Sequence, residues 1–150
     1  MPGARRSTPS RSRFWPRFLL VLLAAAVAFL GPRAVRGYSA LQWTRYHARQ
    51  PPDAFGPSAR GAARWAVVVI RELAPLPWAA EASRLALDVG AKHEIANPSA
   101  SLALYEQVRR ALDVAVDSRW RGLGLESLRE EATRRERDLR ARPDVVKPQP

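Results

Sequence analysis

The side chains able to bind a metal ion or to act in catalysis are few in this sequence and far apart. The chain contains no cysteine and only two histidines, His47 and His93. Thiolate metal sites, disulfides and cysteine nucleophiles are therefore excluded. A histidine metal site would need both imidazoles to converge with carboxylates, and the spacing of these two on different expected helices does not arrange that.

The motifs that accompany catalysis or phosphate binding are also missing. The sequence has no Gly-x-Ser-x-Gly, no Gly-rich phosphate loop and no His-Glu-x-x-His. The glycines of residues 121–125 lack a preceding strand and a following lysine, and Glu130-Glu131 belongs to a helix face rich in acid–base pairs. We therefore predict no catalytic, cofactor-binding or metal-ligating residue, no enzyme activity and no small-molecule substrate.

The element that organises the chain is an apolar segment near the amino terminus, residues 18–30. It holds thirteen apolar residues without a charge, between Arg17 and Gly31-Pro32-Arg33. Thirteen helical residues cover only about 20 Å of a hydrocarbon core of roughly 30 Å. Apolar neighbours on both sides and arginines that extend to the headgroups make a short span feasible.

We predict a transmembrane or signal-anchor helix over 18–35, ended by Gly31 and Pro32 and preceded by a basic tail, 1–17. The side chains predicted to face lipid are Phe18, Leu19, Leu20, Val21, Leu22, Leu23, Val27, Phe29 and Leu30.

A cleaved secretory signal is the alternative interpretation. A charged start, an apolar stretch of suitable length and small residues at Val35-Arg36-Gly37 would allow cleavage before Tyr38, giving a secreted or periplasmic helical protein. Pro32 and the two arginines after the apolar segment make a poor cleavage region, so the anchor is preferred. A buried helix of a soluble protein would need a larger core than this chain offers.

The formal net charge of +11 is concentrated in the first half of the chain. Five arginines and no acid lie in 1–17, seven arginines and Asp53 lie in 18–71, and the two signs balance in 72–150. Basic residues beside a membrane segment are attracted to anionic headgroups. This placement disfavours a nucleic-acid partner, although an anionic-lipid or nucleic-acid binder that uses the basic half is a further alternative.

The charge placement also predicts the orientation. The small arginine excess before the apolar segment favours a cytoplasmic amino terminus and a periplasmic or extracellular carboxy-terminal domain.

The fold class predicted for the whole chain is mainly α, with the membrane or signal helix followed by a small bundle of three to four amphipathic helices. Residues 36–57 form a juxtamembrane basic-aromatic segment with a short helix over 38–50 and a Pro-rich linker. The helical domain covers 58–142, and 143–150 is a disordered tail.

Apolar periodicity and capping signals place the helices of this domain. They run over 58–73, 78–96, 98–117 after the Asn97 cap, and 126–142. The first is expected to bury Trp65 on its apolar stripe, and the second Trp78, Leu85 and Ile95 among others.

The aromatic residues are the candidates for an interface, because a core this small cannot bury all of them. They are Trp43, Tyr46, Trp65, Trp78 and Trp120. The alternative is that they pack in the core. The function predicted from the sequence is a single-pass, membrane-anchored binding or scaffolding module outside the cytoplasm, with the lipid bilayer and another protein as partners.

Overall fold

The computed structural model describes residues 14–53, 56–74, 76–118 and 124–142, and within them it contains five helices and no strand. The helices are α1 (Phe14–Arg49), α2 (Pro57–Leu73), α3 (Pro77–His93), α4 (Pro98–Asp117) and α5 (Leu125–Arg140). The predicted fold class, an amino-terminal apolar helix followed by a helical bundle, is confirmed. The chain forms two compact units, Met1–Pro32 and Arg33–Pro150.

The described part of the first unit is the apolar portion of α1. The side chains predicted to face lipid, Phe18 to Leu23, Val27, Phe29 and Leu30, are between 50% and 69% exposed. The helix is long and apolar enough to cross a membrane or to serve as a signal sequence, and no residue of its apolar window is buried.

The prediction that Gly31 and Pro32 end the first helix is wrong, because α1 continues through Pro32 to Arg49. A proline inside a helix removes one backbone hydrogen bond and disfavours the preceding turn by about 3 kcal/mol. The turns that follow Pro32 bury side chains within the second unit. These contacts stabilise a helical conformation that the local sequence disfavours.

The second unit combines residues 33–49 of α1 with the four helices α2–α5. Gly37, Ala40, Leu41 and Thr44 of α1 are buried, at the i, i+3, i+4, i+7 spacing of one helix face. A Cβ on Gly37 would lie 2.5 Å from Leu73 Cγ, so the glycine allows α1 to pack closely on α2. The short helix predicted over 38–50 is therefore the end of α1, with one face in the core.

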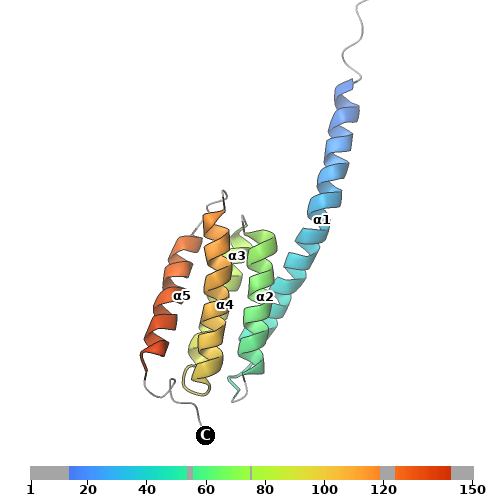
Figure 1. Cartoon of the computed structure of the whole chain (residues 1–150). Coiled ribbons are helices and arrows are strands. Elements are labelled where there is room, and N and C mark those ends of the chain that lie inside the picture. The colour runs from blue at the N-terminus through green and yellow to red at the C-terminus, as the bar shows by residue number, and fades with distance from the viewer. Residues whose placement is uncertain (1–13, 54–55, 75, 119–123, 143–150) are drawn as a thin grey trace, which may run out of the picture. The chain divides into compact units, whose positions relative to one another are not determined.

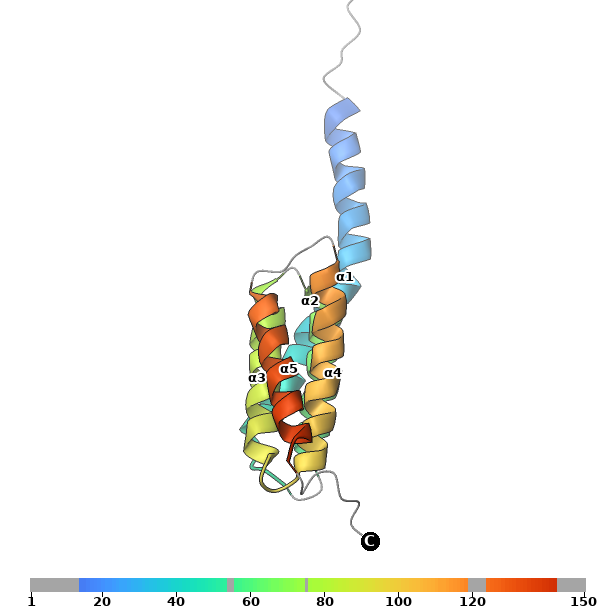
Figure 2. The same cartoon turned by 60° about the vertical axis from the view of Figure 1, so that its left-hand side comes forward.

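Short connections place α2, α3 and α4 beside one another in alternating directions, and α4 packs between α2 and α5 (Figures 1 and 2). The core between them contains many alanines, which let helix backbones approach closely, together with larger buried residues. The largest fully buried side chains include Tyr105, Leu41, Ile70, Leu87, Leu104, Leu112, Leu125 and Leu139.

The helices of the bundle lie close to their predicted positions, with three corrections. α3 ends at His93, so Ile95 lies beyond it and is 94% exposed. Trp78 is exposed and Leu85 is only partly buried, because α3 turns its alanine face, including Ala79, toward the core. α5 begins at Leu125, one residue before its predicted start, and Gly124 before it has the positive φ that glycine allows.

The predicted start of α4 is confirmed in detail. The Asn97 side chain accepts a hydrogen bond from the Ala100 backbone N–H at 3.0 Å, and Pro98 occupies the first helical turn. This cap satisfies one of the free N–H groups at the helix start.

Candidate interaction surfaces

Three of the predicted interface residues come together where α1 crosses α2. Trp43 stacks on Trp65, with ring centroids 6.1 Å apart and planes at 19°, and Tyr46 meets Trp43 edge-on at 5.7 Å. His47 lies against both rings of α1. We call Trp43, Tyr46, His47 and Trp65 the aromatic cluster. Trp43 is 49% exposed and Tyr46 is 52% exposed, so the cluster forms part of the surface.

A close approach of α1 and α2 positions the aromatic cluster. A Cβ on Gly61 of α2 would lie 2.4 Å from the ring of His47, so only glycine leaves room for the imidazole there. Partial burial lowers the pKa of His47 below its usual value, because the charged ring loses hydration. The guanidinium of Arg64 lies 5.3 Å from the Trp65 ring centroid, within the range of a cation–π contact.

The remaining predicted interface residues are not part of this cluster. Trp78 of α3 pairs with Tyr38 of α1, with ring centroids 6.3 Å apart in an edge-on arrangement. Trp120 lies outside the described residues. Of the predicted interface residues that the structure describes, three therefore belong to the aromatic cluster, and Trp78 belongs to a separate pair.

A second surface feature, which the sequence analysis missed, is a groove between α2 and α4 with a volume of about 620 Å³. Its wall is mainly apolar, with Val67 and Val68 on α2 and Ala111 and Val114 on α4. Arg64, Arg71 and Arg110 also line it, and among the residues that the structure describes no carboxylate does. We call this feature the α2–α4 groove. The residue that could have revealed this groove in the sequence is Val114, an apolar residue outside the core-facing stripe of α4. It is 74% exposed.

A buried polar cluster joins Asp53, Ser58 and His93 at the start of α2. The Ser58 hydroxyl and its backbone N–H donate to Asp53 Oδ2 at 2.5 and 3.1 Å. His93 Nδ1 lies 2.9 Å from the Val89 carbonyl oxygen, so it carries the proton, and Nε2 accepts the Asp53 backbone N–H at 3.2 Å.

This arrangement differs from a nucleophile–base pair, because Ser58 donates to a carboxylate and not to the histidine. Burial alone would raise the pKa of Asp53, but hydrogen bonds from the Ser58 hydroxyl and from the backbone N–H groups of Ser58 and Gly56 outweigh it and lower that pKa. The cluster caps α2 and ties the loop before it to the end of α3.

Two further polar clusters connect α4 to its neighbours. The buried Tyr105 hydroxyl donates to Glu94 Oε1 at 2.7 Å, and burial raises the pKa of this phenol well above its usual value. Arg109 donates to Glu136 of α5 and to Asp113 at 2.7 Å each. The first set joins α4 to the residue that follows α3, and the second joins α4 to α5, so both have a structural role.

No group of three or more histidine or acidic side chains suited to a metal ion occurs in the described part of the chain. His93 is engaged with Asp53 and Val89, and His47 lies among the aromatic rings. The two histidines therefore contact different neighbours.

Comparisons with protein families, with curated proteins and with solved structures gave no match for this chain. Function therefore has to be argued from the surfaces described above.

Proposed function

We propose that the protein is a single-pass, membrane-anchored binding module whose helical domain lies outside the cytoplasm. The observation that carries this proposal is the continuity of α1. One uninterrupted helix contains the exposed apolar residues of 18–30 and also Ala40, Leu41 and Thr44, which are fully buried in the bundle. An apolar helix exposed on all sides requires a lipid environment.

Contacts made by the residues just after the apolar segment favour retention of α1 over its removal. Arg33 Nε donates to Glu72 Oε2 at 3.0 Å, and Arg36 lies 4.0 Å from the same carboxylate. The Glu72 side chain is only 11% exposed. Cleavage after Gly37 would remove both arginines, and loss of the partners of a buried polar group costs about 1–3 kcal/mol.

The aromatic cluster and the α2–α4 groove support a binding role for the anchored domain. Exposed apolar patches next to polar or charged residues are typical of interaction sites, and tryptophan, tyrosine and arginine are enriched where partners bind. Both surfaces lie on α2, which presents the aromatic cluster toward α1 and the groove toward α4.

Membrane fractionation combined with intact-mass analysis tests the anchor. The full chain should stay in the pellet after alkaline carbonate extraction, and its mass should correspond to a start at Met1 or Pro2. A soluble product that begins near Tyr38 would instead establish the secreted or periplasmic alternative.

The absence of cysteine from the sequence allows a clean test of orientation. A membrane-impermeant maleimide should label Ala91→Cys in intact cells, because Ala91 is exposed on α3. It should label Ser10→Cys in the amino-terminal tail only after permeabilisation. The opposite labelling pattern would reverse the orientation and leave the anchor intact.

A further inference from the structure

We propose that the α2–α4 groove binds an acidic amphipathic helix of a partner protein. This inference rests on the proposed binding function and adds the chemistry of the partner. It does not depend on the anchor, because every residue of the groove belongs to the bundle.

The shape of the groove suits a helix. The connections at 74–76 and 94–97 each reverse the chain, so α2 and α4 run in the same direction (Figure 1). The lining residues extend from Arg64 to Ala74 on α2 and from Gln107 to Ser118 on α4. At 1.5 Å per residue this is a length of about 15 Å, or roughly three helical turns. Helix-in-groove recognition uses apolar anchors at i, i+3, i+4 and i+7 over such a length.

The wall of the groove offers apolar contacts that the described part of the chain does not cover. Val114 is 74% exposed although it lies beside the partly buried Val67, Val68 and Ala111. Burial of such surface contributes about 25 cal/mol per Å². A partner with an apolar stripe therefore gains stability by covering these side chains.

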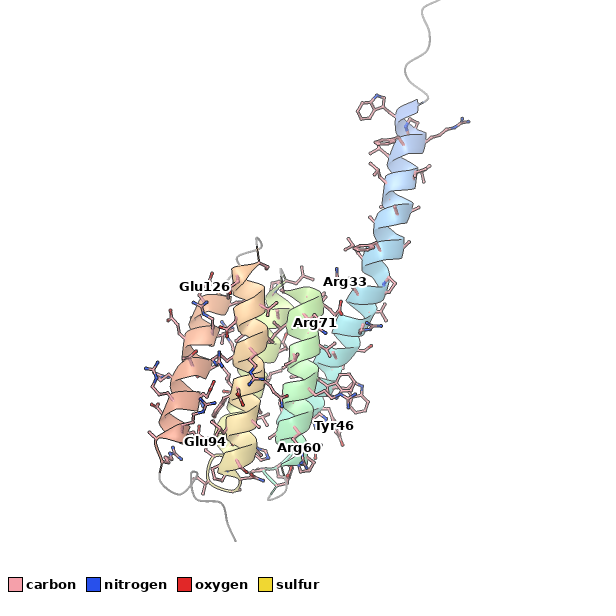
Figure 3. The ribbon with its side chains drawn as sticks, in the orientation of Figure 1. Arg33, Tyr46, Arg60, Arg71, Glu94 and Glu126 are labelled. Atoms are coloured by element: carbon pink, nitrogen blue, oxygen red, sulfur yellow. The ribbon has the colours of Figure 1, made fainter. Side chains whose placement is uncertain are left out.

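The charges around the groove select an acidic partner. Arg60, Arg64 and Arg71 share one face of α2, because they are separated by four and seven residues, and Figure 3 labels Arg60 and Arg71 near opposite ends of the helix. Among the described residues, none of these three has a carboxylate within ion-pair distance. Arg110, on the α4 side, is paired with Glu106 at 2.5 Å. Other arginines of the bundle are paired between helices, such as Arg45 with Glu81.

The spacing of the arginines that lack an ion pair favours a helix over a lipid headgroup. Arg64 and Arg71 are two helical turns apart, a rise of about 10 Å along α2. Two carboxylates seven residues apart on a docked helix reach both guanidinium groups, whereas one phosphate headgroup can contact only one of them. Arginine suits carboxylates especially well, because its planar group can form two parallel hydrogen bonds.

The proposal is tested with the full-length chain in nanodiscs of neutral phosphatidylcholine. The probe is a fluorescent synthetic helix of about 18 residues, with leucine at i, i+3, i+4, i+7 and i+11 and glutamate beside this stripe. A matched peptide carries lysine in place of each glutamate. Fluorescence anisotropy should give a Kd below about 100 μM for the glutamate peptide, and binding at least about tenfold weaker for the lysine peptide.

Variants of the chain locate the binding. Val114→Asp and the pair Arg64→Glu with Arg71→Glu should each weaken the glutamate peptide by about tenfold or more. All three side chains line the groove outside the buried core, so the bundle should remain folded, and circular dichroism checks this. Ile95→Asp is the matched control for Val114, because Ile95 is 94% exposed and lies away from the groove. Arg84→Glu, on the exposed face of α3, is the control for charge.

Several results would overturn the proposal. They are equal binding of the two peptides, no binding of the glutamate peptide, or full binding by the folded Val114→Asp variant. Protection of Val114→Cys from a soluble maleimide in phosphatidylglycerol nanodiscs but not in phosphatidylcholine nanodiscs would assign the groove to anionic lipid. Efficient Val114→Cys disulfide formation between two chains would assign it to a second copy. Membrane fractionation of the same preparation tests separately whether the chain is anchored. The proposed membrane anchor and the proposed helix binding can therefore fail independently.

Discussion

Replacement of Gly90 by alanine changes the stability of the bundle through two opposing effects, the helix propensity of alanine and the close packing of the core. Gly90 lies inside α3, where alanine is favoured over glycine by about 0.5–1 kcal/mol, so helix propensity alone predicts stabilisation. The structure predicts the opposite. A Cβ at this position would lie 2.4 Å from Tyr105 Cε1 and 2.8 Å from Cζ.

The size of the effect follows from how firmly the Tyr105 ring is held. Ordinary van der Waals contact begins near 3.4 Å, so the ring would have to move by about 1 Å. Tyr105 is fully buried, and its hydroxyl donates to Glu94 at 2.7 Å, so this movement also strains the hydrogen bond. Overpacking costs about 1–3 kcal/mol and a hydrogen bond to a charged group contributes about 1.5–3 kcal/mol. After the propensity gain, we expect a net destabilisation of about 2–4 kcal/mol.

Urea unfolding of the full chain in detergent micelles, followed by circular dichroism, measures this loss. The control is the same change in a Tyr105→Leu background, where the ring that clashes is missing. There Gly90→Ala should stabilise by about 0.5–1 kcal/mol, so the effect changes sign across the double-mutant cycle. Stabilisation by Gly90→Ala in the natural background would refute the packing described for α3 and α4.

Three shorter predictions use the same unfolding assay. Leu41→Ala should cost about 2–5 kcal/mol because Leu41 is fully buried, and a change within about 0.5 kcal/mol would show that the end of α1 is not part of the core. Asn97→Ala should cost about 0.5–2 kcal/mol through loss of the α4 cap, and an unchanged midpoint would contradict the cap. Asp53→Asn should be less stable than the natural chain near neutral pH. Since folding lowers the pKa of Asp53, its contribution is present above the usual value of 3.8 and is lost as the pH falls through the folded pKa, so the two curves should converge in acid.

The helices of the bundle could be predicted because their limits are set by local chemistry. Asn97 and Pro98 form a cap followed by a first-turn proline, and this short combination alone places the start of α4. Pro77 does the same for α3. The apolar run of residues 65–70 could be assigned to a helix because no second strand was available to pair with it.

The continuity of α1 could not be predicted, because it depends on contacts distant in sequence. Gly31 and Pro32 are helix-breaking signals, and only the burial of Ala40, Leu41 and Thr44 against later helices explains why the helix persists. Residues 36–57 were predicted to be a juxtamembrane segment for the same reason.

Which aromatic side chains are buried was also hard to predict. Helical periodicity placed Trp65 and Trp78 on the apolar stripes of their helices, whereas small residues such as Ala79 occupy the contacts between helices. Trp65 is partly exposed instead and stacks on Trp43. The α2–α4 groove was missed because it is formed by the flanks of two helices, outside the apolar stripe of either one.

The structure changes the meaning of the arginine excess that follows the apolar segment. The sequence suggested that these charges serve the membrane surface. Arg33 and Arg36 instead face Glu72, and Arg45 faces Glu81, so three of them find carboxylates supplied by later helices. Orientation is set while the chain is inserted, before these pairs exist, so these arginines still count against the five that precede the apolar segment.

In the folded domain, by contrast, the arginines that have no ion pair among the described residues include Arg60, Arg64 and Arg71 of α2. Arg64 and Arg71 lie along the groove rather than around the exit of α1. In the sequence, this basic stretch indicates a lipid-binding region. After folding, part of it forms ion pairs that stabilise α1 against the bundle, and another part lines the groove with positive charge. The arginines that line the groove offer charge to an acidic partner.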